Sequence, residues 1–391
     1  MLFRKCLLAS FAVLLGGSML LNAPAARAQG ESNQAAQQTQ AHMLDEKHSG
    51  VKKAMDELVK RKEVPGVLAQ VVKNGETWSY GAGQASIYSD RKMEPEFHYR
   101  IGSITKTFVA TVMLQLAEEK KLSLDDSVEK WLPDVVQGNG YNGNNITIRQ
   151  LLNHTSGIAC YTTEDFAKRL VETPYRMYSV DELIRLGLKQ KPLFEPGKGW
   201  SYSNTGYVLA GAIIQKVTGK TYSDNIEERI IHKLGLKETF VAGTQSSLPD
   251  PHARGYVGLE DKQYIDITEL NPSWANAAGD MISTAKDLNT FFSALLGGKL
   301  VSHESMTQML DGVEAPVGRY GLGIYEITKR ADGESVWGHS GGIPGFGSQS
   351  GGTVGGNYVM SANINVLWFG KSTSNPFDQI FHAEFDDTDK P

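Results

Sequence analysis

The sequence GSITKTFVATVMLQLAEEKK, residues 102–121, predicts one long helix that begins with a polar turn and continues through apolar positions. Ser103 and Lys106 are three residues apart, so they lie on the same face of such a helix. Burial and the positive helix N-terminus both favour the neutral form of Lys106. A neutral amine beside a hydroxyl group can act as the general base for a serine nucleophile.

The Ser-x-x-Lys pattern predicts little by itself, because the chain contains it five times, at Ser49/Lys52, Ser89/Lys92, Ser103/Lys106, Ser127/Lys130 and Ser283/Lys286. A polar surface pair is the alternative interpretation of any one of them. Ser103 differs in its context, since a glycine precedes it and a long apolar helix follows it. Context therefore selects Ser103 as the candidate nucleophile and Lys106 as its base.

A Tyr-x-Asn element occurs once, at Tyr202 and Asn204. Alternate residues of an extended segment project to the same side, so the phenol could relay a proton while the amide holds a substrate carbonyl. The alternative interpretation is a helix-capping turn, with Asn204 as the N-cap of a helix at 205–217.

A His-x-Gly element occurs at His48/Gly50 and at His339/Gly341. We expect His48 in solvent, because its surroundings are polar. His339 precedes a glycine-rich run in which another backbone, such as a peptide substrate, can pair along a strand. We expect His339 to be a cationic or donor group at that edge. The alternative is a glycine-rich loop with a chance histidine.

Residues 1–28 have the features of a cleaved signal peptide, with two early basic residues, an apolar run at 7–21 and small residues up to Ala28. The run of about 15 residues is shorter than the roughly 20 of a spanning helix. We therefore expect cleavage near Ala28 and secretion without a stable membrane anchor. Residues 29–41 are glutamine-rich and predict a flexible spacer or pro-segment.

Composition excludes several classes of function. The formal net charge is −5, and no basic cluster is present, which argues against nucleic acid and anionic membranes as partners. The nine histidines lack metal-ligand spacing, and no phosphate or dinucleotide motif occurs, so we expect neither metal nor cofactor. Signal cleavage would leave one cysteine, Cys160, which we expect to be buried and inert.

Strand signals gather at the two ends of the chain and helix signals between them. Asn74-Gly75 predicts a hairpin between 67–72 and 76–81, and strand-like runs return after residue 320. Helices are expected at 42–62, 103–121, 148–152, 180–188, 205–217, 284–296 and 376–385.

This pattern predicts an α/β fold in which both chain ends build one antiparallel sheet flanked by helices. The α/β region would comprise 42–121 and 301–391, and a mostly helical region at 122–300 would be inserted into it. A substrate cleft is expected where the two regions meet.

The three elements, in this order and spacing, resemble the penicillin-recognising serine hydrolases, the group of DD-peptidases and class C β-lactamase-like enzymes. Further matching stretches are Phe97–Ser103, Leu151–Gly157, Pro196-Gly197, Ser273–Ala275 and Tyr320–Gly323. The likeness is greatest to soluble D-alanyl-D-alanine carboxypeptidases and alkaline D-peptidases. It implies a β-lactamase/transpeptidase-like fold.

The resemblance implies an acyl-enzyme on Ser103, a proton relay by Lys106 and Tyr202, and support of that relay or of the substrate's negative side by His339. It also implies that Asn204 holds a substrate amide and that the backbone N–H groups of Ser103 and Gly342 form an oxyanion hole. Further residues that resemble cleft-lining positions are Tyr161, Thr163, Trp274, Tyr325 and Gly341.

One position departs from the family pattern. In the carboxypeptidase most similar to this sequence, an arginine follows the Tyr-Gly-Leu-Gly-x motif and pairs with the substrate's terminal carboxylate. Tyr325 stands there in this chain and cannot make a bidentate ionic contact. Arg319 or Lys329 could supply the charge instead, so carboxypeptidase and D-stereospecific endopeptidase both stay open.

The resemblance thus implies a secreted, monomeric hydrolase of D-amino-acid peptides or peptidoglycan stem peptides, with β-lactams as acylating ligands. A β-lactamase or an esterase of the same fold is the alternative among enzymes. A non-catalytic penicillin-binding or cell-wall-binding protein is the alternative from another class. That alternative predicts loss of Lys106 or Tyr202, and the sequence retains both.

Overall fold

The structure is a computed structural model, and the residues that it describes are 39–40, 42–259, 263–368 and 375–386. The expected signal peptide at 1–28 and residues 29–38 of the expected spacer lie outside the described residues. The described residues from His48 onward form one compact unit, and the few described residues before it do not belong to that unit. Within the described ranges, no helix is long and apolar enough to cross a membrane.

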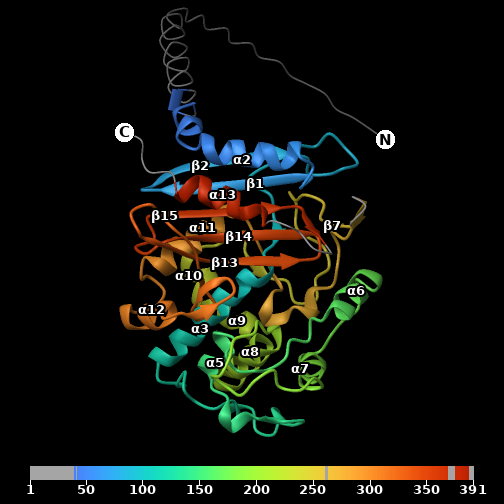
Figure 1. Ribbon diagram of the computed structural model, residues 1–391, viewed down its shortest axis with the longest axis vertical. Helices are drawn as coiled ribbons and strands as arrows, with labels where there is room; N and C mark the ends of the chain where they lie inside the picture. Colours follow the sequence, from blue (N-terminus) through green and yellow to red (C-terminus); the bar gives the residue numbers. More distant parts are fainter. Residues whose placement is uncertain (1–38, 41, 260–262, 369–374, 387–391) are drawn as a thin grey trace, which may run out of the picture. The chain divides into compact units, whose positions relative to one another are not determined.

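An eight-stranded sheet lies at the centre of the 48–391 unit, and all of its neighbouring strands are antiparallel (Figure 1). Its strand order is β10 (Val313–Ala315), β11 (Gly318–Tyr320), β12 (Tyr325–Lys329), β13 (Ser335–Ile343), β14 (Phe346–Thr353), β15 (Tyr358–Ile364), β1 (Gly66–Lys73) and β2 (Glu76–Gly83). Strands from the two ends of the chain meet at β15 and β1. The predicted antiparallel sheet built from both chain ends is confirmed.

The hairpin between β1 and β2 has the turn that the sequence predicts. Asn74 and Gly75 both have positive φ, 51° and 86°, between the paired residues Lys73 and Glu76. Two positive φ angles define a type I′ turn, whose twist matches that of the strands. The hairpin therefore follows from local backbone chemistry.

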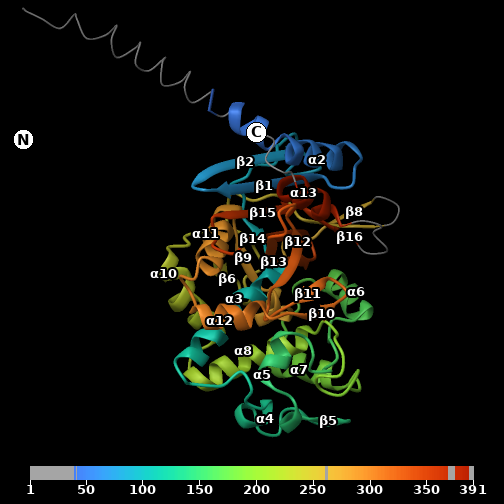
Figure 2. The ribbon, with the colours of Figure 1, turned by 60° about the vertical axis from the view of Figure 1, so that its left-hand side comes forward.

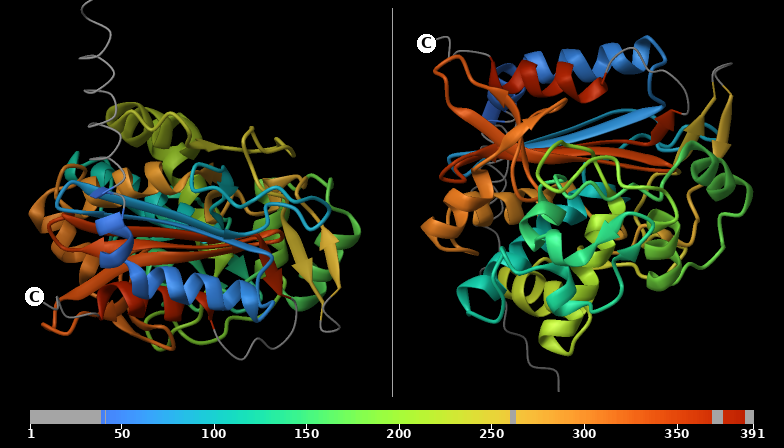
Figure 3. Two further views of the ribbon diagram at one scale, coloured as in Figure 1. Left: turned by 90° about the horizontal axis from the view of Figure 1, so that it is seen from above. Right: turned by 60° about the horizontal axis from the view of Figure 1, so that its bottom comes forward.

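Helices cover both faces of the sheet. Helices α2 (Ser49–Lys60) and α13 (Pro376–Phe385) lie side by side on one face, and α11 (Ala285–Leu296) packs on β14 and β15 from the other (Figure 3). Helix α2 buries Val51, Met55 and Leu58, which are spaced to form one apolar stripe. His48 precedes α2 and is buried against Glu384 at 2.9 Å, so the expectation that His48 lies in solvent is wrong.

The chain between β2 and β10 is mostly helical (Figure 2). Its helices and turns are η1 (Gly102–Ile104), α3 (Thr105–Glu118), α4 (Val128–Trp131), η2 (Gly143–Asn145), α5 (Ile148–Leu152), α6 (Glu164–Glu172), α7 (Val180–Leu188), α8 (Asn204–Thr218), α9 (Tyr222–Ile226), η3 (Glu227–Ile231), α10 (His232–Leu234), η4 (Pro272–Trp274), η5 (Asn276–Ala278) and α12 (His303–Leu310). Its short strands, with β16 (Val366–Trp368), are β3 (Tyr99–Arg100), β4 (Gln137–Gly138), β5 (Tyr141–Asn142), β6 (Phe240–Val241), β7 (Tyr256–Gly258), β8 (Tyr264–Asp266) and β9 (Met281–Ser283). The predicted boundaries of the inserted helical region, at residues 121 and 300, stay a prediction. Helix α11 falls within the predicted insertion but packs on β14 and β15 of the sheet.

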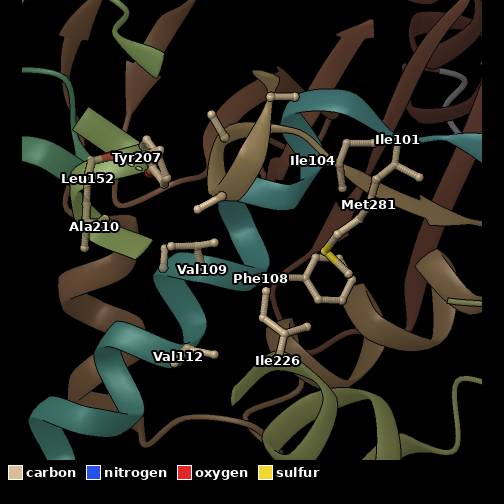
Figure 4. Packing of buried hydrophobic residues seen from close by; sticks show 14 of the residues in the cluster. Ile101, Ile104, Phe108, Val109, Val112, Leu152, Tyr207, Ala210, Ile226 and Met281 are labelled. Carbon is tan, nitrogen blue, oxygen red and sulfur yellow. Dashed lines mark hydrogen bonds between the residues drawn. The ribbon is translucent and has the colours of Figure 1, made fainter. Parts of the chain in front are cut away.

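Helix α3 lies in the core and is buried from Thr105 to Leu116. Figure 4 shows it between Leu152, Tyr207 and Ala210 on one side and Ile101 and Met281 on the other. Aliphatic and aromatic side chains surround it, so any polar group on this helix must find its partner inside the protein. Lys106, the second residue of α3, is under that constraint.

Candidate active site

Ser103 lies in η1, the single turn that leads into α3, and its side chain is half-buried. Gly102 makes the turn possible in two ways. Its φ of +51° disfavours residues with a side chain, and a Cβ there would lie 3.0 Å from the backbone nitrogen of Gly342 on β13. The candidate nucleophile Ser103 is thus held where the turn before α3 meets the sheet.

The amine of Lys106 lies 3.0 Å from Ser103 Oγ, 2.7 Å from Asn204 Oδ1 and 2.6 Å from the carbonyl oxygen of Ala278. Burial lowers the pKa of Lys106 to about 7, so much of this amine is neutral at neutral pH. A neutral amine has two hydrogens and one lone pair. The two carbonyl oxygens can only accept, so they take both hydrogens, and the lone pair faces the hydroxyl of Ser103.

The ring of Tyr202 lies close to the same amine, with Lys106 Nζ 4.8 Å from its centre. Burial raises the pKa of Tyr202, and a hydrogen bond with Ser103 opposes that shift. The phenol is therefore protonated at neutral pH. It can donate its proton and accept another, as a relay requires, but it is not a resting base.

Asn204 does not cap its helix, so that alternative interpretation is wrong. Ser203 is the N-cap of α8 and accepts from the backbone N–H of Gly206, while Asn204 is the first helical residue. The Asn204 side chain accepts from Lys106 through Oδ1 and donates to Thr162 Oγ1 through Nδ2 at 3.0 Å. These two contacts fix the orientation of the amide.

Strand β13 borders the nucleophile with its glycine-rich end. A Cβ on Gly341 would lie 1.9 Å from the carbonyl oxygen of Ile101 and 3.1 Å from the backbone nitrogen of Ser103, so only glycine fits this approach. Strand β12 pairs with residues Ser335 to Gly338 of β13, and among the described residues this pairing ends at Gly338. The exposed Gly342 therefore lies on a strand end that a substrate backbone can approach.

His339 is buried behind this edge, and of the two expected characters, cationic or donor, its surroundings disfavour the cationic one. Its Nε2 lies 2.8 Å from the hydroxyl of Tyr320, and the side chain is 2% exposed. Burial, with the nearby charge of Lys106, lowers the pKa of His339 to about 3. The imidazole is therefore neutral at physiological pH.

The remaining predicted residues divide into two groups. Tyr161, Trp274 and Tyr325 are buried, and the hydroxyl of Tyr161 donates to the carbonyl of Trp274 at 2.5 Å. Thr163 is exposed and caps α6 by accepting from Phe166 N–H. The adjacent residue, Thr162, makes the contact with the Asn204 amide instead.

Sequence reasoning missed two groups of this site, the carbonyl of Ala278, which contacts the amine of Lys106, and Thr162, which contacts the amide of Asn204. Cys160 also belongs here, since its sulfur lies 2.9 Å from Thr162 Oγ1 and accepts from the backbone N–H of Asn204 at 3.4 Å. It is only half-buried, so the expectation that it is buried is wrong, and the expectation that it is inert stays a prediction. Position next to a predicted residue is the only signal that could have pointed to Thr162.

The two cations considered for a substrate carboxylate are engaged elsewhere. The guanidinium of Arg319 lies over the ring of Trp337, 5.6 Å from its centre. Lys329 is largely exposed, and its amine lies 3.7 Å from Glu326. Lys106 is thus the basic side chain in direct contact with the nucleophile among the described residues.

A serine in contact with a buried lysine, at the start of a helix beside an antiparallel sheet, is the arrangement of a serine hydrolase with the fold of β-lactamases and penicillin-binding proteins. The chain belongs to the beta-lactamase family, whose model, described as Beta-lactamase, matches residues 51–366.

Two curated relatives are similar over part of their length. Penicillin-binding protein 4* of Bacillus subtilis (strain 168) is 32% identical over 283 residues, which cover 69% of this chain and 61% of that protein. Protein flp of Staphylococcus aureus (strain MW2) is 31% identical over 229 residues, which cover 58% of this chain and 44% of that protein. This chain therefore spans 44% to 61% of the length of these relatives.

Two solved structures match over nearly their whole length. A D-stereospecific amidohydrolase from Streptomyces sp. is 41% identical, with a TM-score of 0.79, covering 86% of this chain and 98% of that chain. The D-amino acid amidase from Ochrobactrum anthropi SV3, complexed with D-phenylalanine, is 30% identical, with a TM-score of 0.75 and the same coverage of 86% and 98%.

Proposed function

We propose that this protein is a D-stereospecific peptidase or amidase that hydrolyses bonds next to D-residues through an acyl-enzyme on Ser103. The observation that carries the proposal is the set of contacts of Lys106 Nζ with Ser103 Oγ, Asn204 Oδ1 and the carbonyl oxygen of Ala278, which lets a neutral amine turn its lone pair towards Ser103. Preference for D-residues is supported by the similarity to a D-stereospecific amidohydrolase and to a D-amino acid amidase.

The proposed reaction begins when Lys106 takes the proton of Ser103 and the serine oxygen attacks the carbonyl carbon of the substrate. The oxyanion of the tetrahedral intermediate accepts hydrogen bonds from the backbone N–H groups of Ser103 and Gly342. The C–N bond then breaks, and the proton passes from Lys106 through Tyr202 to the leaving nitrogen. Water attacks the ester with Lys106 again as base, which releases the acid and restores Ser103.

The charges near Ser103 favour a substrate whose leaving group carries no free carboxylate. Burial raises the pKa of Tyr325 to about 12, so its phenol is neutral at physiological pH, as is His339. Arg319 and Lys329 have other partners. An amide or an internal peptide bond needs no cation here, whereas a free terminal carboxylate would lose its bulk solvation without gaining an ionic partner.

We also propose β-lactams as acylating ligands of Ser103, as an alternative activity in the same site. Membership of the beta-lactamase family and similarity to a penicillin-binding protein support this proposal. The same nucleophile would open the lactam ring, so hydrolysis of a chromogenic cephalosporin measures whether the resulting ester turns over.

The test compares peptides that carry D-Phe or L-Phe at the same internal position, each with a free or an amidated C-terminus, and a peptide ending in D-Ala-D-Ala. We expect cleavage beside D-Phe, with the amidated peptides at least as good as the free ones. Cleavage of the L-peptides at equal rates would refute the stereochemical claim, and cleavage of free-carboxylate peptides alone would refute the claim about the leaving group.

Two serine variants complete this test. Ser103→Ala should abolish cleavage. Ser89→Ala changes a serine in another Ser-x-x-Lys match, on the exposed surface, and should retain it. Equal loss in both variants would contradict the assignment of the nucleophile.

A further inference from the structure

A row of buried hydrogen bonds connects the two sides of the active site behind the nucleophile. The backbone N–H of Ser203 donates to His154 Nδ1 at 3.2 Å, and His154 Nε2 lies 3.1 Å from the hydroxyl of Tyr320. The same hydroxyl lies 2.8 Å from His339 Nε2, and His339 Nδ1 lies 2.5 Å from the carbonyl oxygen of Ser340. Five groups from four separate segments thus form one continuous chain.

The two ends of the chain fix the direction of each hydrogen bond. A backbone N–H can only donate, so His154 Nδ1 carries no hydrogen and its neutral ring has the hydrogen on Nε2. A backbone carbonyl can only accept, so His339 Nδ1 carries the hydrogen and Nε2 accepts. His154 therefore donates to the oxygen of Tyr320, and Tyr320 donates to His339.

This assignment requires both imidazoles to be neutral, and their surroundings favour that state. His154 is 1% exposed and His339 is 2% exposed, and burial, together with Lys106 whenever that amine is protonated, lowers the pKa of both rings. The hydroxyl of the adjacent Tyr207 donates to the carbonyl of Leu152 at 2.7 Å. If Tyr320 donated its hydrogen to Tyr207 instead, Nε2 of His339 would have to donate to the oxygen of Tyr320. His339 would then carry a hydrogen on both ring nitrogens and a positive charge, which burial opposes.

We propose that His154 and Tyr320 are positioning residues, which hold the Tyr202–Asn204 segment at a fixed distance from the Gly341–Gly342 end of β13. Ser203 lies between Tyr202 and Asn204, and Ser340 precedes Gly341, so the chain ties together the two elements that flank Ser103. This inference rests on the proposed acyl transfer at Ser103, because positioning matters to that reaction.

His154 is built into its place by the backbone. Its φ of +64° lies in the left-handed region, and its carbonyl oxygen accepts from the backbone N–H of Ser201 at 3.0 Å. Its ring centre lies 4.3 Å from that of Tyr202. A non-glycine residue in this conformation is uncommon, which agrees with a side chain that is needed at this point.

The first test is kinetic. Tyr320→Phe removes both central hydrogen bonds and keeps the ring, and it should lower the rate of Ser103 acylation by a fluorophosphonate about tenfold while KM for a D-peptide changes little. His154→Asn tolerates the backbone and retains an acceptor for Ser203, so it should keep more activity than His154→Ala. Equal activity of Tyr320→Phe and the wild type would overturn the proposal.

Matched controls come from the far face of the sheet. Tyr358 and His48 are also buried, and both contact Glu384, at 2.7 Å and 2.9 Å. Tyr358→Phe and His48→Gln should lower thermal stability without lowering the acylation rate of the folded protein. If these variants slow acylation as much as Tyr320→Phe does, the effect is general destabilisation and the proposal fails.

The second test needs no substrate, so it separates this inference from the proposed function. Nitrogen-15 NMR of histidine-labelled protein, assigned with the His154 and His339 variants, distinguishes the tautomers. We expect hydrogen on Nε2 of His154 and on Nδ1 of His339, both neutral at pH 7. The same tautomer in both rings, or a protonated His339 at that pH, would overturn the directed chain even if the protein cleaves D-peptides. The expected tautomers in a protein that cleaves none would refute the proposed function alone.

Discussion

Replacing Asn204 with aspartate should move the activity of this enzyme to more alkaline pH. Asn204 Oδ1 lies 2.7 Å from Lys106 Nζ, so the change places a negative charge beside the amine. At an effective dielectric constant of about 20, two charges about 4 Å apart interact by about 4 kcal/mol, or roughly 3 pKa units. The pKa of Lys106, which burial lowers from 10.5 to about 7, would return towards its ordinary value.

The direction in which the pH profile moves follows from the role of the amine as a base. Only neutral Lys106 can accept the proton of Ser103, so activity rises as pH rises through the pKa of Lys106. The rising limb of kcat/KM should be centred near pH 7 in the wild type, where the pKa is about 7, and should move alkaline in Asn204→Asp. Burial lowers the pKa of His154 and His339 and raises that of Tyr202, so none of these three should produce this limb.

The assay is kcat/KM for a neutral chromogenic amide of D-phenylalanine across the range from acid to alkaline pH. Asn144→Asp introduces the same charge on the exposed surface and should leave the limb in place. Asn204→Asp should also lower the maximum, because Asn204 is a proposed substrate ligand. A limb that stays in place or moves to acid pH in Asn204→Asp would refute Lys106 as the base.

Two further substitutions test the geometry around the nucleophile. Gly341→Ala places a Cβ 1.9 Å from the carbonyl oxygen of Ile101 and should lower both the melting temperature and the activity. Gly342→Ala places a Cβ 3.4 Å from Leu367 Cδ1, an ordinary contact, and should fold normally; equal melting temperatures of the two variants would contradict this account. Thr162→Val keeps the shape of the side chain but removes the hydrogen-bond partner of Asn204 Nδ2, so kcat/KM should fall about tenfold. Circular dichroism should show that the fold is retained. An unchanged kcat/KM would show that Thr162 does not orient the amide.

Much of the fold could be predicted because its signals are local. The positive φ angles of Asn74 and Gly75 are an intrinsic preference of those residues, so the hairpin is readable from two letters. The apolar run after Ser103 predicts a buried helix without knowledge of its neighbours. The α13 bounds agree with the predicted 376–385, where Pro376 at the first helical turn follows the capping residue Asn375.

The site was less predictable because its contacts join distant segments. The oxygen that accepts from Lys106 is the backbone carbonyl of Ala278, and every residue offers such a group, so no sequence pattern marks it. The contact between Tyr320 and His154 spans 166 positions. Asn204 was open to two interpretations because Ser203, beside it, is an equally good cap. Packing in three dimensions decides each of these cases.

The most direct test of the central claim, that Ser103 carries the acyl group, is the mass of the intact protein after mixing with a penicillin or a D-phenylalanine ester, followed by mapping of the modified peptide. We predict a single adduct on Ser103, formed in Ser89→Ala and missing from Ser103→Ala. An adduct on any other residue, or the same adduct in Ser103→Ala, would contradict the account.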